Sequence, residues 1–176
     1  MQNETYLASV KQQFSYYKSL GEKAMAQLEP EQLFILPYND GNSIAIIVQH
    51  MAGNMLSRWT DFLNTDGEKE WRDRDNEFEI ILTERDDVLR KWEEGWGCLQ
   101  LALDSLKPEQ LEDIILIRNE PHTIVQAINR QLAHYPYHVG QIVFYAKYLT
   151  GSKFKSLSIP KHKSAEFNKE KFKSVN

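Results

Sequence analysis

Two histidines near the middle of a long apolar-periodic stretch have a spacing that suits metal binding. His134 and His138 lie four residues apart within the segment HYPYHVGQI, residues 134–142. Residues i and i+4 of an α-helix share one face, so two imidazoles with this spacing can bind one metal ion. The segment lacks the glutamate of the metalloprotease signature and does not indicate a peptidase. A third ligand must come from elsewhere, and His50, within the apolar stretch 46–53, is the natural candidate.

The same histidines have a simpler interpretation, because the chain contains five of them and such a pair arises readily by chance. A histidine on an apolar helix face is usually a hydrogen-bonded core residue. The metal interpretation therefore depends on the fold bringing His50 to the pair. His122, in an expected turn, and His162, in a basic tail, are predicted not to be ligands.

Four helices are predicted to carry these residues. Apolar residues recur at steps of three and four over residues 5–28, 43–63, 83–107 and 123–149. In the third helix Trp92 and Trp96 fall on the apolar seam, which is typical of a helix packed nearly antiparallel in a bundle. They are expected in the core rather than at a cofactor.

The connections between these helices are predicted from their local signals. Residues 39–43 form a turn that supplies a helix N-cap, and Thr83 with Asp86 resembles a capping box. Residues 33–38 are expected to be extended, residues 114–117 an isolated strand, and residues 119–123 a turn. The polar connection 64–82 is either a solvated loop or a lid over a pocket, with Trp71 and Phe78 as anchors.

An internal repeat suggests how the helices are organised. The motif LEPEQL at residues 28–33 recurs as LKPEQL at 106–111, and each copy precedes a histidine-bearing helix. The chain is therefore predicted to be all-α, with two helical hairpins packed as a four-helix bundle. Residues 1–150 form the expected metal-binding domain and residues 151–176 a C-terminal extension. Bundle cores build metal sites from side chains on facing helices.

Charge and composition limit the possible partners. The formal net charge is −4, but residues 151–176 contain seven lysines and two glutamates, so the rest of the chain carries −9. An acidic body makes nucleic acid an unlikely partner, although the basic tail leaves that weaker alternative. The single cysteine, Cys98, is expected in the core and fits a cytoplasmic location. No signal peptide and no membrane-spanning run are expected.

The histidine pattern resembles that of the DinB superfamily, which includes bacterial thiol-dependent S-transferases. The resemblance covers residues from about 4 to 150 and rests on His50 in the second helix and on HYPYHVGQ in the fourth. It implies a DinB-like four-helix bundle with His50, His134 and His138 as ligands of a divalent metal, Zn or Ni, and it implies a dimer. The pair RW at 58–59 and the run LSIP at 157–160 look like those of an uncharacterised branch.

Pro136 departs from an ideal helix between the two histidines. A proline inside a helix removes one hydrogen bond, clashes with the carbonyl of Leu132 and costs about 3 kcal/mol. A helix that begins at Pro136 would leave His134 outside it. The apolar periodicity from Ile128 to Leu149 favours one continuous, kinked helix.

These features predict a metal-dependent enzyme of the thiol S-transferase or hydrolase type. Three imidazoles leave open coordination positions on a metal, which lowers the pKa of a bound water or thiol. A low-molecular-weight thiol is the expected cosubstrate. The alternative is a non-catalytic bundle that binds a metal or a small molecule as a sensor or scaffold.

Two further residues are predicted to bind the substrate. Asn54, small and polar, lies one turn beyond His50. Arg130 lies four residues before His134, where it either covers apolar surface and reaches solvent or holds an anionic group of a small-molecule substrate.

A homodimer is predicted from aromatic side chains in excess of one core stripe. These residues are Trp59, Phe62, Phe144, Tyr145 and Tyr148. The alternative is that they complete the core beneath the tail.

Overall fold

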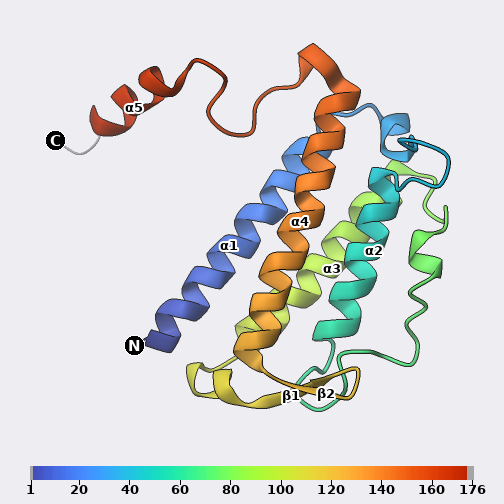
Figure 1. Cartoon of the computed structure of the whole chain (residues 1–176), viewed down its shortest axis with the longest axis vertical. Coiled ribbons are helices and arrows are strands. Elements are labelled where there is room, and N and C mark those ends of the chain that lie inside the picture. The colour runs from blue at the N-terminus through green and yellow to red at the C-terminus, as the bar shows by residue number, and fades with distance from the viewer. Residues whose placement is uncertain (1, 174–176) are drawn as a thin grey trace.

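Four long helices run along a common axis in the computed structural model, which describes residues 2–173 (Figure 1). The elements of this body are α1 (Gln2–Met25), α2 (Ile44–Trp59), α3 (Arg85–Ser105), α4 (Ile124–Thr150), and the strands β1 (Ile114–Ile117) and β2 (Glu120–Thr123). A fifth helix, α5 (Ser164–Lys173), lies in the C-terminal extension, whose last three residues fall outside the described part. The protein is thus mainly helical with one small sheet, which broadly confirms the all-α prediction.

The helices that pack most closely are not consecutive in the chain. The most extensive contacts join α2 to α3 and α1 to α4. In Figure 1, α1 and α4 run upward and α2 and α3 run downward, so each close pair is parallel. The prediction of two packed hairpins is therefore wrong, because the helices that pack most closely are not joined by the short connections. The connection after α2 returns along the length of the body, so α3 begins at the same end as α2 and lies beside it.

Aromatic side chains from three helices meet in the middle of the core. Phe14 of α1 lies 6.4 Å from Trp96 of α3 and 6.0 Å from Tyr135 of α4, measured between ring centroids, and Trp96 lies 5.4 Å from Trp92. All four rings are buried, which confirms the core prediction for the two tryptophans. Cys98 is half-buried against the same core, and burial raises the pKa of its thiol.

Both copies of the repeated motif form the same local structure. Each is a short 3-10 helix, Pro30–Phe34 after α1 and Pro108–Glu112 after α3. The glutamine of each copy reaches back three residues to accept a hydrogen bond at 2.9 Å, from the backbone N–H of Glu29 or of Lys107. The predicted extended segment 33–38 is consequently helical at its start. The motif is a device that ends one helix and turns the chain.

The capping predictions were partly right. Ser43 caps α2 by accepting a hydrogen bond from the N–H of Ile46 at 3.3 Å, as expected for the end of the turn. Thr83 does not cap α3; Glu84 occupies the N-cap position and its side chain makes no capping bond. The sequence pattern that resembles a capping box, Thr83 with Asp86, therefore begins one residue before the actual N-cap.

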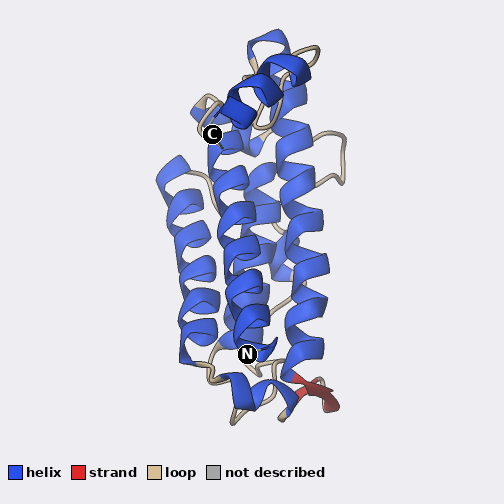
Figure 2. Ribbon diagram, turned by 90° about the vertical axis from the view of Figure 1, so that its left-hand side faces the viewer, coloured by secondary structure: helices blue, strands red, loops and turns tan. Residues whose placement is uncertain are grey.

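The predicted isolated strand has a partner. Ile114–Ile117 pairs antiparallel with Glu120–Thr123, which includes most of the residues expected to form a turn. Arg118 and Asn119 make the actual turn, with φ values of 55° and 60°. Pro121 lies in the second strand, which is tolerated because that strand is an edge. Figure 2 shows this hairpin at one end of the helices.

Helix α4 continues through Pro136, as predicted. Tyr135 beside it is fully buried, so tertiary packing holds the helix across the proline. The missed helix is α5, which is polar and contributes no buried residue, so it has no apolar period to reveal it. None of the described helices is both long and apolar enough to cross a membrane.

Two glycines of α3 provide a matched stability test. A Cβ on Gly95 would lie 2.8 Å from the Cα of Ala52 in α2, whereas a Cβ on Gly97 meets nothing within 4 Å. We expect Gly95→Ala to lower the free energy of unfolding by about 1–3 kcal/mol, because the helices must separate. Gly97→Ala should raise it by about 0.5–1 kcal/mol through helix propensity. Chemical denaturation measures both, and equal effects would contradict the close α2–α3 packing.

Candidate metal centre

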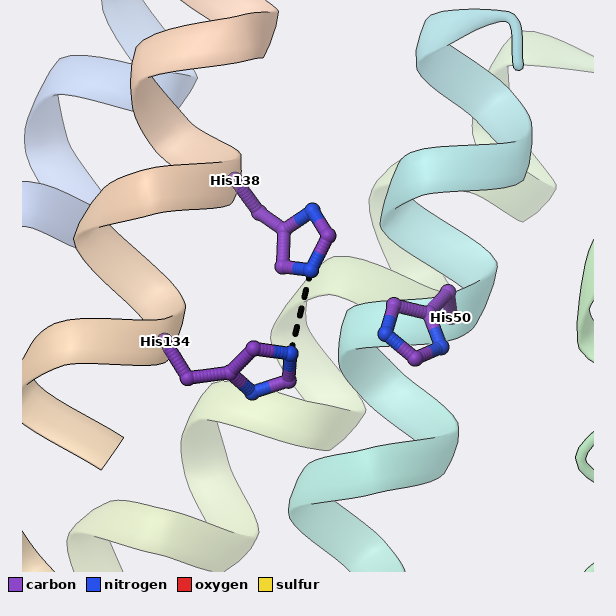
Figure 3. Close-up of side chains that lie close together, drawn as sticks. All are labelled: His50, His134 and His138. Atoms are coloured by element: carbon purple, nitrogen blue, oxygen red, sulfur yellow. Dashed lines mark hydrogen bonds between the residues drawn. The ribbon is translucent and has the colours of Figure 1, made fainter. Parts of the chain in front are cut away.

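Three histidines converge between α2 and α4. His50 comes from α2, and His134 and His138 come from successive turns of α4 (Figure 3). One nitrogen of each ring lies within 4.8 Å of the others, and the Nε2 atoms of His134 and His138 are 3.0 Å apart. The structure therefore brings together the three residues that the sequence singled out. His122 lies in β2 and His162 in the extension, outside the cluster.

Each of these rings has an oxygen partner at Nδ1. The contacts are His50 to Glu77 Oε2 at 2.8 Å, His138 to Gln141 Oε1 at 2.8 Å, and His134 to Gln131 Oε1 at 3.3 Å. An oxygen acceptor selects the tautomer with hydrogen on Nδ1, which leaves the lone pair on Nε2. Both glutamines lie three residues from their histidine on α4, so helical periodicity creates these contacts.

The arrangement of the three rings could hold a cation in place of the hydrogen bond between His134 and His138. A proton shared between the two facing Nε2 atoms would leave one Nδ1 without hydrogen against an amide oxygen. Two free lone pairs at 3.0 Å repel each other, and a cation between them removes the repulsion. Nitrogens bound to one zinc ion at about 2.0–2.1 Å lie about 2.8–3.4 Å apart for angles of about 90–110°. The 3.0 Å separation of the His134 and His138 nitrogens fits such an ion.

Burial favours the uncharged form of both α4 histidines. It lowers the pKa of His134 from 6.5 to about 3, assisted by the nearby His138, His50 and Arg130. Burial likewise lowers the pKa of His138, although its bond with Gln141 acts in the opposite direction. Metal binding by imidazole requires this neutral form.

Glu77 is the residue that sequence reasoning missed. It is buried, and it contacts His50 on one side and Arg72 on the other, with Arg72 bonds of 2.7 and 3.0 Å to its two oxygens. Burial alone would raise the pKa of the Glu77 carboxyl, but these bonds outweigh it and hold that pKa below its usual value. A carboxylate behind a ligating histidine fixes the ring and increases its basicity.

Gly53 was the feature of the sequence that could have indicated a side chain packed closely beside His50. A Cβ on Gly53 would lie 2.3 Å from the Oε1 of Glu77, so only glycine leaves space for the carboxylate there. The sequence showed a small residue three positions after His50 but not what fills the space.

The connection between α2 and α3, which carries Glu77, is fixed to α2. Gln49 donates its side-chain amide to three backbone carbonyls of the connection, those of Asn76, Glu77 and Glu79, at 3.0–3.2 Å. Phe78 stacks on His50 with ring centroids 4.7 Å apart. Phe78 is thus an anchor, as predicted, but Trp71 is mostly exposed and is not.

A cavity of about 260 Å³ adjoins the cluster. Its lining comprises His50, Asn54, Gln131, His134 and five arginines: Arg58, Arg72, Arg74, Arg118 and Arg130. Both predicted substrate-binding residues, Asn54 and Arg130, therefore border the same space as two of the histidines. The hydroxyl of buried Tyr135 donates to the Oδ1 of Asn54 at 3.1 Å, which orients the amide.

The fold and the cluster define a helical protein with a candidate three-histidine metal site. The chain belongs to the family described as "Protein of unknown function (DUF1572)", whose family model matches residues 2–163. The searches of curated proteins and of solved structures found no match.

We expect acid to lower the free energy of unfolding of the metal-free protein, because His134 is harder to protonate in the folded state. Its folded pKa, about 3, lies below its ordinary 6.5, so the unfolded chain binds the proton first and the folded state loses stability as the pH falls from 6.5 toward 3. The slope is at most about 1.4 kcal/mol per pH unit for one proton, and less for a partly exposed ring. Glu77 adds to the loss only below its ordinary 4.5.

Urea denaturation of chelator-treated protein at neutral pH and at about pH 5 measures this slope. We expect His134→Gln to flatten it, whereas His162→Gln, which changes an exposed histidine of the extension, should leave it unchanged. An identical slope in both variants would show that His134 is not the group responsible.

Proposed function

We propose that the protein is a DinB-like four-helix bundle and a metal-dependent enzyme of the thiol S-transferase or hydrolase type. His50, His134 and His138 would hold a divalent metal, Zn or Ni, and a low-molecular-weight thiol is the proposed cosubstrate. The observation that carries the proposal is the set of three converging imidazoles, each with its Nδ1 against an oxygen acceptor. A bound metal would supply a lowered pKa for the nucleophile, whether water or thiol.

The remaining residues have positioning and binding roles in this proposal. Glu77 fixes the ring of His50, and Arg72 keeps Glu77 ionised. Asn54, oriented by Tyr135, and Arg130 bind the substrate in the adjoining cavity. The buried aromatic core beneath Tyr135 excludes water from one side of the site.

Elemental analysis of protein purified without a histidine tag tests the metal. We expect one divalent ion per chain, lost in His134→Ala and in His138→Ala. Glu77→Gln should weaken metal binding about 10- to 100-fold, as removal of a carboxylate behind a ligating histidine does elsewhere.

Glu94→Gln, a change of the same chemistry on an exposed face of α3, serves as the control and should bind metal like the wild type. Metal at unchanged stoichiometry in both histidine variants would refute the site. A loaded protein that is inactive in thiol-transfer and hydrolysis assays would support the non-catalytic sensor or scaffold instead.

We also propose that the protein forms a homodimer, through α4. Tyr137, Phe144 and Tyr148 follow one stripe of this helix and are 63%, 75% and 73% exposed. Trp59 and Phe62, which were also expected at the interface, are buried core residues, and Tyr145 donates a hydrogen bond to the carbonyl of Ile35. The interface assignment is therefore wrong for Trp59 and Phe62, because they complete the core.

Light scattering at micromolar concentration should give twice the chain mass of 20.6 kDa. Phe144→Glu should shift the mass toward that of one chain, since it places a charge in an apolar contact. Leu101→Glu, at a comparably exposed position on α3, should not. A wild-type mass near that of one chain would contradict the dimer.

A further inference from the structure

The cavity beside the histidine cluster is strongly basic in an otherwise acidic protein. Five arginines line it, while the whole chain has a formal charge of −4. Glu68 accepts hydrogen bonds from Arg58 at 2.9 Å, from Arg72 at 3.3 Å and from Arg118 at 3.1 Å. Glu77 is a second carboxylate in contact, through Arg72. Asp66 is a third, since it accepts a hydrogen bond from the backbone N–H of Arg118 and lies close enough to Arg58 to interact with its charge. Three carboxylates against five guanidinium groups leave an excess of two positive charges.

The excess charge is located on specific side chains. Within residues 2–173, no carboxylate forms an ion pair with Arg74 or Arg130, and the Arg74 guanidinium lies 5.1 Å over the ring of Phe78. Arg58 is 95% buried, and its Nε has no hydrogen-bond partner among the described residues. That atom is closed to solvent, so the charges available to a ligand are those of Arg74 and Arg130.

The arginines reach the cavity from four parts of the fold. Arg58 comes from α2, Arg74 from the connection, Arg118 from the hairpin turn and Arg130 from α4. A carboxylate is planar and is satisfied by one guanidinium fork, whereas a tetrahedral anion accepts hydrogen bonds from several directions. An excess of two positive charges also matches an anion of more than one charge.

The position of Arg118 is fixed by the connection. Asp66 accepts hydrogen bonds from the backbone N–H groups of Arg118 at 2.8 Å and Asn119 at 2.6 Å. These bonds hold the left-handed hairpin turn against the connection that also carries Glu68. The fold therefore fixes the backbone that carries Arg118, while the Arg118 side chain itself is 54% exposed.

We infer that this cavity binds a phosphate group and that the substrate is a phosphorylated small molecule. The inference rests on the proposed function, because His50 and His134 border the cavity and also belong to the candidate metal site. The cavity volume of about 260 Å³ suits the phosphate group alone. The rest of the molecule would extend past His50 and His134, the two candidate metal ligands that border the cavity.

Titration of inorganic phosphate into the metal-free full chain tests the cavity without the metal. Isothermal calorimetry at constant ionic strength should show binding by the wild type. Arg74→Gln and Arg130→Gln should each weaken it by about tenfold or more, since each removes a charge-assisted bond. Arg90→Gln removes an equal charge from an exposed site on α3 and should change binding by less than about twofold.

Competition identifies the anion. Sulfate, which is tetrahedral and doubly charged, should displace phosphate, whereas acetate should displace it poorly. No phosphate binding by the wild type, an equal loss in Arg90→Gln, or acetate competing as well as sulfate would each overturn the inference.

Metal titration of the same samples separates the two proposals. His138→Gln should lose the metal and keep phosphate binding, because His138 does not line the cavity. Metal binding without phosphate binding would overturn the inference alone. Phosphate binding with no metal site would support the phosphate cavity and overturn the metal-dependent enzyme.

Discussion

The ionised carboxylate of Glu77 is buried between α2 and the connection that follows it, and its neighbours have to compensate that charge. Arg72 does so with two bonds, and His50 lies on the other side. A buried carboxylate left without partners is destabilising by several kcal/mol, so the connection, α2 and the histidine must stay in register. The orientation of His50 and the place of Arg72 in the cavity wall both follow from this one contact.

One turn of α4 serves the core and the site together. Tyr135 points into the aromatic centre, His134 and His138 point toward α2, and Tyr137 is exposed. The buried tyrosine holds the helix across Pro136 and also orients Asn54 through its hydroxyl. Packing in the core thus determines how the two imidazoles face His50, and a change in the core alters the histidine cluster.

The sequence predicted the elements whose signals are local. Periodicity located the four helices, and the i,i+4 spacing with His50 located the cluster that the structure contains. What it missed depends on the path of the chain. Glu77 and the arginine lining come together only because the connection returns along α2, and no local pattern encodes that path. The same path explains why α2 lies beside α3 rather than α1.

The short elements were missed for a different reason. β2 contains a proline and α5 contributes nothing to the core, so neither has the apolar alternation by which such segments are detected. The helix caps show a similar limit, since the residue type alone did not separate Thr83 from Glu84.

The many hydrogen bonds made to the connection between α2 and α3 have a thermodynamic consequence. Gln49 holds three of its carbonyls, Asp66 joins it to the hairpin, and Arg58 donates a hydrogen bond to the carbonyl of Gly67. A wall held at so many points has little conformational entropy left to lose when a ligand arrives. Such a wall is preorganised, so a bound ligand would leave the backbone as it was, and the heat of binding would report on hydration and charge rather than on the ordering of a loop.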